Sequence, residues 1–350
     1  MKTCPNCGGS IVGDGHTQPM RCENAECPVD RECDAEVLYC ESQLNKAEYT
    51  VLSGDCIESL KTLPDECINT CVTSPPYFGL RDYGCDGQIG LEETPDAFVK
   101  KLVEVFREVK RVLRDDGTLW LNLGDSYAAN RGYQVPDGKV GDVGNSKGMK
   151  ADTIGLKPKD LIGIPWRVAF ALQQDGWYLR QDIIWHKPNP MPESVTDRCT
   201  KAHEYIFLLS KSAKYYFDNE AIKEDAVAPN VKHKSSKKSE AQESAYVGRA
   251  PTNLGRCGTG DDGKRNRRSV WTVTTKPYKG AHFATFPSDL IEPCILAGCP
   301  AGGTVLDPFG GSGTTAGVSV KNGRDAVLCE LNPNYIGLIA ARVKLIAEKK

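Results

Sequence analysis

The feature that most constrains the fold of this chain is a short apolar run that ends in an acid and is followed at once by clustered glycines. Residues 304–315 read TVLDPFGGSGTT, which is typical of a buried strand, a tight turn and a helix start. Glycines let a ligand approach the backbone closely, and a helix N-terminus offers unpaired N–H groups beside it. A second apolar run, residues 326–330, ends in Glu330 about twenty residues on, where a doubly wound sheet commonly binds ribose hydroxyls. The spacing indicates an α/β nucleoside site, although the glycines do not match G-x-G-x-x-G and alone fit a structural turn equally well.

A second segment lies much earlier in the chain, where residues 73–78 read TSPPYF directly after a predicted apolar strand. Pro75 and Pro76 fix φ and lack N–H groups, so the carbonyls of Ser74 and Pro75 cannot be absorbed by a continuing strand or helix. A hydroxyl and a carbonyl that face one pocket can hold an exocyclic amino group by its two protons, while the ring of Tyr77 stacks on the attached base. The alternative is a simple strand-ending turn, which the glycine-rich segment in the same chain makes less favoured.

In this order the two segments resemble those of amino-methylating DNA methyltransferases, in the permuted group that carries the catalytic motif before the cofactor motif (the β-type order). The resemblance covers approximately residues 48–345. It implies that S-adenosyl-L-methionine binds at the glycine-rich segment and that the SPPY segment holds the target base. The implied catalytic residues are Ser74, Pro75, Pro76 and Tyr77. The implied cofactor-binding residues are Asp307, Phe309, Gly311, Gly313, Thr314, Glu330, Asp55, Phe286 and Pro287.

Three of the implied cofactor positions also have a plainer interpretation. Asp55 follows a predicted strand, and its carboxylate suits the N-cap of the next helix as well as the adenosine end of the cofactor. Phe286 and Pro287 would border the methionine part of the cofactor, or would simply precede a helix that Ser288 caps. His203 and Glu204 precede the last predicted strand, where a structural or DNA-side hydrogen bond is preferred over a catalytic pair.

The resemblance implies a Rossmann-like methyltransferase sheet of seven strands whose last strand runs antiparallel. The chain offers candidate strands near residues 305, 327, 50, 70, 120, 182 and 207. The predicted organisation has four parts: a zinc-ribbon-like module at 1–45, the catalytic half at 46–212, an inserted target-recognition region at 213–280 and the cofactor-binding half at 281–350.

The zinc prediction rests on the spacing of cysteines near the N-terminus. Cys4 and Cys7 are separated by two residues and followed by glycines, and Cys22 and Cys27 form a second, more widely spaced pair. Four thiolates suffice for one tetrahedral, structural Zn²⁺. Further candidate ligands are His16, Cys33 and Cys40. The alternative, a cluster of buried thiols, would be hard for a segment with so few large apolar residues.

Charge points to a DNA-binding region within residues 230–280. The whole chain has a formal net charge of −2, but this stretch has twelve Lys and Arg against four Asp and Glu. Such a local excess suits phosphate binding, although part of it is expected to be an ordinary solvated surface. Arg265, Arg267 and Arg268 are the best candidates because guanidinium groups read guanine edges as well as phosphates.

The predicted reaction is direct methyl transfer to the amino group of a base swung out of double-stranded DNA. The resemblance favours cytosine N4, since serine is the commoner first clamp residue in those enzymes; adenine N6 is the main alternative. Less favoured are an inactive DNA-binding module and an RNA or protein methyltransferase. No apolar run reaches membrane-span length and the first residues lack a signal-peptide core, so a cytoplasmic protein is expected. A companion restriction nuclease is compatible with the chain but cannot be read from it.

Overall fold

The computed structural model divides into two compact units, Met1–Glu36 and Val37–Lys350. It describes residues 47–80, 82–128, 155–226, 263–275 and 286–348, together with the backbone of short strands at 2–3, 10–12, 21–22 and 38–41. In the first unit, β1 (Lys2–Thr3), β2 (Ser10–Val12) and β3 (Arg21–Cys22) form an antiparallel sheet.

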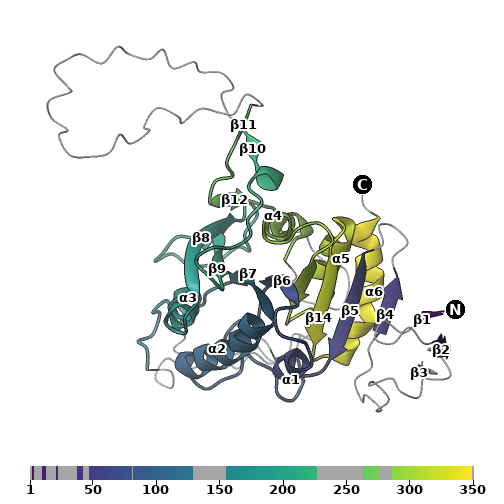
Figure 1. Cartoon of the computed structure of the whole chain (residues 1–350). Helices are drawn as coiled ribbons and strands as arrows, with labels where there is room; N and C mark the ends of the chain where they lie inside the picture. Colours follow the sequence, from purple (N-terminus) through teal and green to yellow (C-terminus); the bar gives the residue numbers. More distant parts are fainter. Residues whose placement is uncertain are drawn as a thin grey trace, which may run out of the picture. The chain divides into compact units, whose positions relative to one another are not determined.

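The second unit is built on one large sheet, in which the described residues supply nine strands in the order β12-β8-β9-β7-β6-β13-β14-β5-β4 (Figure 1). Its strands are β4 (Leu38–Glu41), β5 (Glu48–Ser53), β6 (Ile68–Thr73), β7 (Leu113–Leu123), β8 (Tyr178–His186), β9 (His203–Ser210), β12 (Val270–Thr272), β13 (Thr304–Asp307) and β14 (Asp325–Glu330). A separate antiparallel pair consists of β10 (Glu224–Asp225) and β11 (Lys264–Arg265).

All seven predicted strands lie in the large sheet. As expected for this fold class, β9 runs antiparallel to both of its neighbours, β7 and β8. The prediction of seven strands was nevertheless too low, because the short strands β4 and β12 extend the sheet at its two edges.

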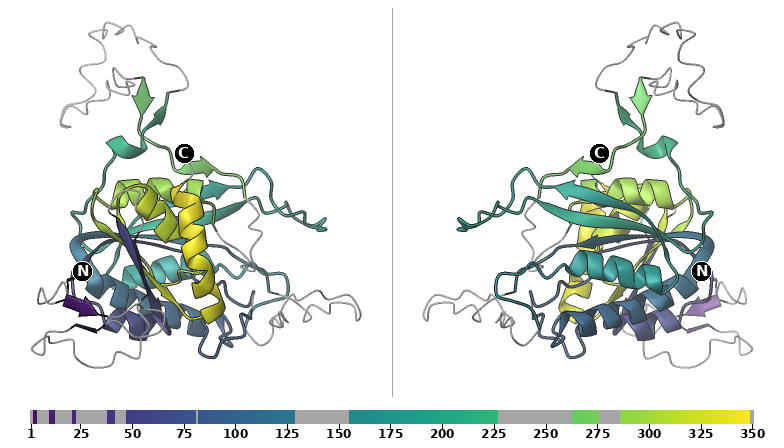
Figure 2. Two further views of the ribbon diagram at one scale, coloured as in Figure 1. Left: turned by 90° about the vertical axis from the view of Figure 1, so that its right-hand side faces the viewer. Right: turned by 90° about the vertical axis from the view of Figure 1, so that its left-hand side faces the viewer.

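Helices cover both faces of the sheet (Figures 1 and 2). One face carries α1 (Cys56–Lys61), α2 (Pro95–Val112) and α3 (Ile164–Gln174), and the other carries α4 (Ser288–Gly298), α5 (Thr314–Lys321) and α6 (Pro333–Ala347). A short 3-10 helix, η2 (Glu220–Ile222), precedes β10. Within the described residues, no helix is both long and apolar enough to cross a membrane.

The longest helix, α2, illustrates how local sequence sets an element. The Thr94 hydroxyl accepts a hydrogen bond from the Ala97 N–H at 3.1 Å, and Pro95 occupies the first turn, where its missing N–H does no harm. Phe98 and Leu102 belong to a stripe at helical spacing that is fully buried against the sheet. This stripe therefore forms core rather than a site.

The central position of β13 brings together the two motifs that are far apart in the sequence. β13 lies parallel to β6 on one side and to β14 on the other, with Leu306 opposite both Cys71 and Val327. Because parallel strands end at the same edge of a sheet, the glycine turn after β13 and the SPPY segment after β6 lie next to each other.

Candidate active site

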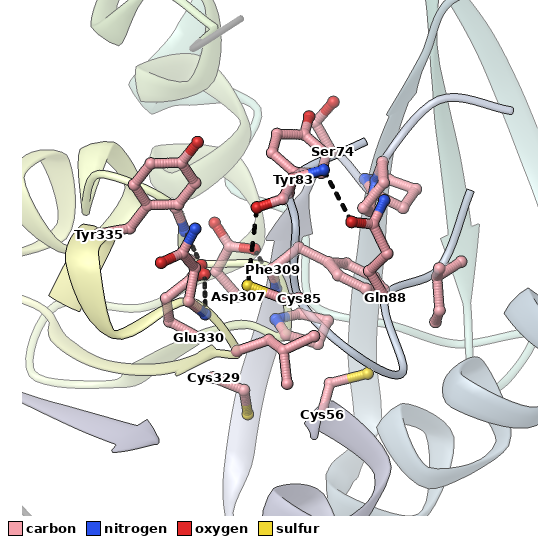
Figure 3. A pocket seen from close by; sticks show the side chains of 18 of the residues that line it. Cys56, Ser74, Tyr83, Cys85, Gln88, Asp307, Phe309, Cys329, Glu330 and Tyr335 are labelled. Atoms are coloured by element: carbon pink, nitrogen blue, oxygen red, sulfur yellow. Dashed lines mark hydrogen bonds between the residues drawn. The ribbon is translucent and has the colours of Figure 1, made fainter. Parts of the chain in front are cut away.

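A cleft opens where β5, β6, β13 and β14 end. It encloses about 1110 Å³, including its open mouth, which is ample for a nucleoside-sized ligand. Figure 3 shows Glu330 and Tyr335 on one side of it and Ser74 and Gln88 on the other. The cleft is lined by the predicted residues Asp55, Ser74, Pro75, Pro76, Tyr77, Phe286, Asp307, Phe309, Gly311, Thr314 and Glu330, among others.

Asp307 ties the two motifs together at the floor of the cleft. Its Oδ1 accepts hydrogen bonds from the Thr73 hydroxyl at 2.6 Å and the Phe309 N–H at 3.1 Å, and its Oδ2 accepts one from the Thr315 hydroxyl at 2.6 Å. Burial raises the pKa of this carboxyl group, while the three donors oppose that shift. A single side chain thus joins the end of β6 to the turn and to the start of α5.

The glycine turn needs glycine for two physical reasons. Gly311 and Gly313 have φ values of 51° and 84°, in the left-handed region that other residues rarely adopt. A Cβ on Gly313 would also lie 2.8 Å from Cγ2 of Ile339. Beside them, the buried hydroxyls of Ser312 and Thr314 have no hydrogen-bond partner. Unpaired buried hydroxyls at a helix start suit a polar ligand that would satisfy them.

Glu330 has the burial and partners of a residue that waits for hydroxyl donors. Its Oε2 accepts from the Gly311 N–H at 2.7 Å and its Oε1 from the Asn332 N–H at 2.8 Å. Each oxygen of a carboxylate can accept more than one hydrogen bond, so room remains for ribose hydroxyls. Burial raises the pKa of Glu330 to about 7.

The other predicted cofactor residues divide between the cleft and its frame. Asp55 caps α1, accepting from the Ile57 and Glu58 N–H groups at 2.9 and 3.1 Å, and it also lines the cleft. Phe286 lines the cleft, whereas Pro287 occupies the N-cap position of α4. The alternative that Ser288 caps this helix was wrong, because Ser288 is already its first helical residue and Pro287 has the extended backbone of an N-cap.

In the SPPY segment, Pro75 is buried and Ser74 and Tyr77 are half-buried. The Tyr77 hydroxyl donates to Oε2 of Glu204 at 2.7 Å, so Glu204 makes a hydrogen bond within the protein, the kind of role that its sequence position favoured. A Cβ on Gly124 would lie 2.4 Å from Cε2 of Tyr77, so the ring packs directly on this backbone. Burial, followed by the charge of Glu204, raises the pKa of Tyr77 well above its usual value.

Several lining residues were not predicted. Tyr83 and Gln88 come from the loop after the SPPY segment, where the Gln88 Oε1 accepts from the Tyr83 N–H at 2.7 Å. Tyr335, from the first turn of α6, meets Tyr83 nearly edge-on, with ring centroids 6.3 Å apart. An aromatic residue shortly after the acid that ends β14 was the available signal for Tyr335; the loop offered only its closeness to the clamp.

The predicted metal ligands fall largely outside the described residues. This holds for Cys4, Cys7 and Cys27, while Cys22 is described only as backbone of β3, opposite Ile11. Within the described part of the chain, no three His, Cys, Asp or Glu side chains are grouped so as to hold a metal ion.

The three candidate DNA-binding arginines lie around β11. Arg265 and Arg268 both donate to Oε1 of Glu224, at 2.9 and 2.7 Å, and they lower the pKa of that carboxyl group against the opposing effect of burial. The Arg267 guanidinium lies 4.7 Å from the ring centroid of Trp271. Residues 227–262 and 276–285, which hold most of the basic stretch, lie outside the described residues.

Comparison with known proteins yields matches along most of the chain. A family model described as "DNA methylase", for N6 and N4 methylases, matches residues 68–341. The type II methyltransferase M.Cfr9I of Citrobacter freundii is 50% identical over 304 residues, covering 86% of this chain and 89% of that protein. M.SmaI of Serratia marcescens is 48% identical over 295 residues, covering 84% and 90%.

Solved structures share the fold at lower sequence identity. The cytosine-N4-specific PvuII DNA methyltransferase superposes with a TM-score of 0.56 at 18% identity, covering 86% of this chain and 90% of that one. A DNA modification methylase of Thermus thermophilus, solved in complex with S-adenosyl-L-methionine, gives 0.51 at 23% identity, covering 85% and 95%.

Proposed function

Because this chain belongs to the N6/N4 family of DNA methylases, we propose that it transfers a methyl group from S-adenosyl-L-methionine to the N4 amino group of a cytosine in double-stranded DNA. The observation that carries the proposal is the meeting of the SPPY segment and the glycine turn in one cleft, joined by the Asp307–Thr73 hydrogen bond across 234 residues. A cofactor pocket and an amino-group clamp are thereby held side by side.

The residues present fit this cofactor. The unpaired hydroxyls of Ser312 and Thr314, at the start of α5, are buried polar groups that suit a charged or hydroxylated ligand. Glu330 and Asp55 would accept from hydroxyl groups of the adenosine part, and Phe286 would contact its apolar surface. When bound, S-adenosyl-L-methionine supplies an electrophilic methyl group.

The protein's part in the reaction is to hold and orient the base. An amino nitrogen inside the DNA stack is out of reach, so the target base must be swung out into the cleft. The Ser74 hydroxyl and the Pro75 carbonyl accept the two amino protons, which draws the nitrogen lone pair away from the ring and toward the methyl donor. Tyr77 lies beside them, where its ring edge or face contacts the base. No thiol nucleophile is required.

The choice of cytosine is supported by the serine at position 74, which the resemblance associates with N4 enzymes. The likeness to the PvuII enzyme is one of fold and adds no more than consistency. Adenine N6 is the second candidate, because its amino group presents the same two protons.

The test is to incubate the enzyme with S-adenosyl-L-methionine and genomic DNA, digest the DNA to nucleosides and identify the product by mass. N4-methyldeoxycytidine is expected, and N6-methyldeoxyadenosine would replace cytosine by adenine in the proposal. Parallel reactions with single-stranded DNA, RNA and protein should incorporate much less methyl group than duplex DNA. Equal incorporation into RNA or protein would contradict the assignment of duplex DNA as substrate. Sequencing the methylated positions then defines the recognition sequence.

We further propose that residues 213–280 recognise the target sequence through Arg265, Arg267 and Arg268. Two of these guanidinium groups share the single carboxylate of Glu224, so a positive charge remains for a phosphate or a guanine edge. Alanine at Arg268, which is 64% exposed, should weaken duplex binding at low salt and lower the salt dependence of binding by about one ion. Unchanged binding at every salt concentration would exclude Arg268 from the interface.

For the N-terminal module, we propose a structural Zn²⁺ held by Cys4, Cys7, Cys22 and Cys27. The support is the cysteine spacing itself. Elemental analysis of the purified protein should find one zinc per chain, which Cys4→Ser and Cys22→Ser each abolish. Cys199→Ser, at an exposed free cysteine, is the matched control and should keep its zinc. A zinc-free wild-type protein would refute the proposal.

A further inference from the structure

A series of side chains leads from the clamp into the body of the protein. The Ser74 hydroxyl lies within hydrogen-bonding reach of the Tyr77 hydroxyl, which donates to Oε2 of Glu204 at 2.7 Å. Glu204 stands near the start of β9, and its other oxygen, Oε1, is hydrogen-bonded to the Lys187 ammonium. The Glu204 and Lys187 side chains are only 15% and 18% exposed, so the series ends in a well-covered ion pair.

The last member of this series determines the direction of every hydrogen bond before it. A carboxylate that is paired with an ammonium group can only accept, so Tyr77 must direct its phenol proton to Glu204. The raised pKa of Tyr77 means that the phenol retains this proton. Tyr77 then has only lone pairs to offer Ser74. In the hydrogen bond between them, the serine must therefore be the donor.

Neighbouring groups support this arrangement without competing with it. Oδ1 of Asn122 lies 3.4 Å from the Tyr77 hydroxyl, farther than the carboxylate, and its amide Nδ2 donates to the Tyr205 carbonyl at 3.0 Å. Because Gly124 has no side chain, the Tyr77 ring can lie against the end of β7 with its hydroxyl directed to Glu204. The position of the ring and the direction of its proton are thus both set from outside the SPPY segment.

We propose that Glu204 is a positioning residue that, acting through Tyr77, commits the Ser74 hydroxyl to accepting an amino proton of the target base. A free serine hydroxyl is equally able to donate, and the ring N3 next to the cytosine amino group would attract its proton. With that proton directed to Tyr77, the lone pairs of Ser74 face the remainder of the cleft. The inference rests on the proposed function and adds to it a residue from β9.

The first test replaces Glu204 by glutamine, which has the same shape but can donate as well as accept. The single-turnover methylation rate should fall about 10- to 100-fold, the size of one hydrogen bond to a charged group. The affinity for S-adenosyl-L-methionine, measured by calorimetry, should stay unchanged. Glu292→Gln is the control, because Glu292 is also a partly covered carboxylate paired with a lysine, Lys321, but lies on α4 away from the clamp.

The second readout does not depend on turnover. Duplexes that carry the mapped recognition sequence are compared with cytosine or pyrimidin-2-one, which lacks the amino group, at the target position. The wild-type protein should bind the cytosine duplex more tightly, and Glu204→Gln should lose this preference. Tyr77→Phe should do the same, and the double variant should lose no more than either single variant, because both act through one series.

The outcomes separate this inference from the function on which it rests. A wild-type protein that methylates no DNA refutes the proposed function. A wild-type protein that methylates DNA beside a Glu204→Gln variant with an undiminished rate and an intact preference for the amino group refutes the role of Glu204 alone. Additive losses in the double variant would also overturn it, since they would show that Glu204 and Tyr77 act independently.

Discussion

The glycine turn and the SPPY clamp border the same cleft, yet they are held in place in opposite ways. The turn is held mostly by near neighbours, since Asp307 accepts from Phe309 and Thr315, and Glu330 from Asn332. The clamp depends on distant residues, because Tyr77 is fixed by Glu204, 127 positions away. The turn is therefore formed by its own sequence, whereas the clamp takes shape only when the sheet is complete. Changes in the turn should act on stability and cofactor affinity, and changes in the clamp should act on rate.

The largest effect is expected at Ser74. Replacing it by alanine removes a hydrogen-bond acceptor that matters in the transition state, so the single-turnover rate should fall by about 10² to 10³. The affinity for S-adenosyl-L-methionine should stay as it is in the wild-type protein, as measured by calorimetry. A parallel loss of cofactor affinity would break the contrast between the two regions.

Asp307→Asn is expected to act mainly on stability. The amide would face hydroxyl and N–H donors with a donor of its own, leaving buried groups unpaired at a cost of about 3 kcal/mol. Urea denaturation measures this loss, and cofactor affinity should fall with it. Asp325→Asn is the control, because the half-buried Asp325 accepts a single backbone N–H, that of Glu48. Equal losses in the two variants would show that Asp307 has no special role in joining the motifs.

A smaller loss is expected for Gly313→Ala, about 2 kcal/mol from the positive φ and the contact with Ile339 together. Gly323→Ala separates the two causes, since Gly323 has a φ of 70° but nothing within 4 Å of an added Cβ. That variant should lose only about 1 kcal/mol, the conformational part. Thermal denaturation of both variants gives the comparison, and a larger loss at Gly323 would contradict it.

The smallest effect concerns pH and Glu330. Its pKa of about 7 lies above the usual value of 4.5, so the free protein holds a proton there that is lost as the pH rises through 7. If ribose hydroxyls donate to the ionised carboxylate, cofactor affinity should be full above pH 7 and fall about tenfold per unit below it. Calorimetry between pH 5.5 and 8.5 is the measurement, roughly spanning the shifted pKa. Glu330→Gln should bind more weakly at high pH and show no such dependence.

Local sequence was sufficient for much of the fold and for half of the site. The apolar runs predicted all seven strands, because a buried parallel strand has a composition that needs no partner to be recognised. The glycine turn was predicted because left-handed backbone has its own residue preference. Gly117 was expected just after the long helix, but α2 ends at Val112 and Gly117 lies within β7, so local turn preference was overridden there.

The rest of the site has no local signature. A tyrosine and a glutamate 127 residues apart reveal nothing of their hydrogen bond until β7 and β9 are known to be neighbours. The same applies to Tyr83 and Tyr335, which meet only because the loop after β6 and the start of α6 reach the same cleft. The edge strands β4 and β12 were missed because they are too short to show a period.

The place of β13 in the sheet has a consequence for synthesis. β5 and β6 are made early and consecutively, but in the finished sheet β14 and β13 stand between them. As the chain leaves the ribosome, both early strands must keep an open edge until roughly the final fifth of the protein has emerged. A nascent chain in which β5 paired directly with β6 would have to separate them again, which makes closure of this gap the expected slow step of folding.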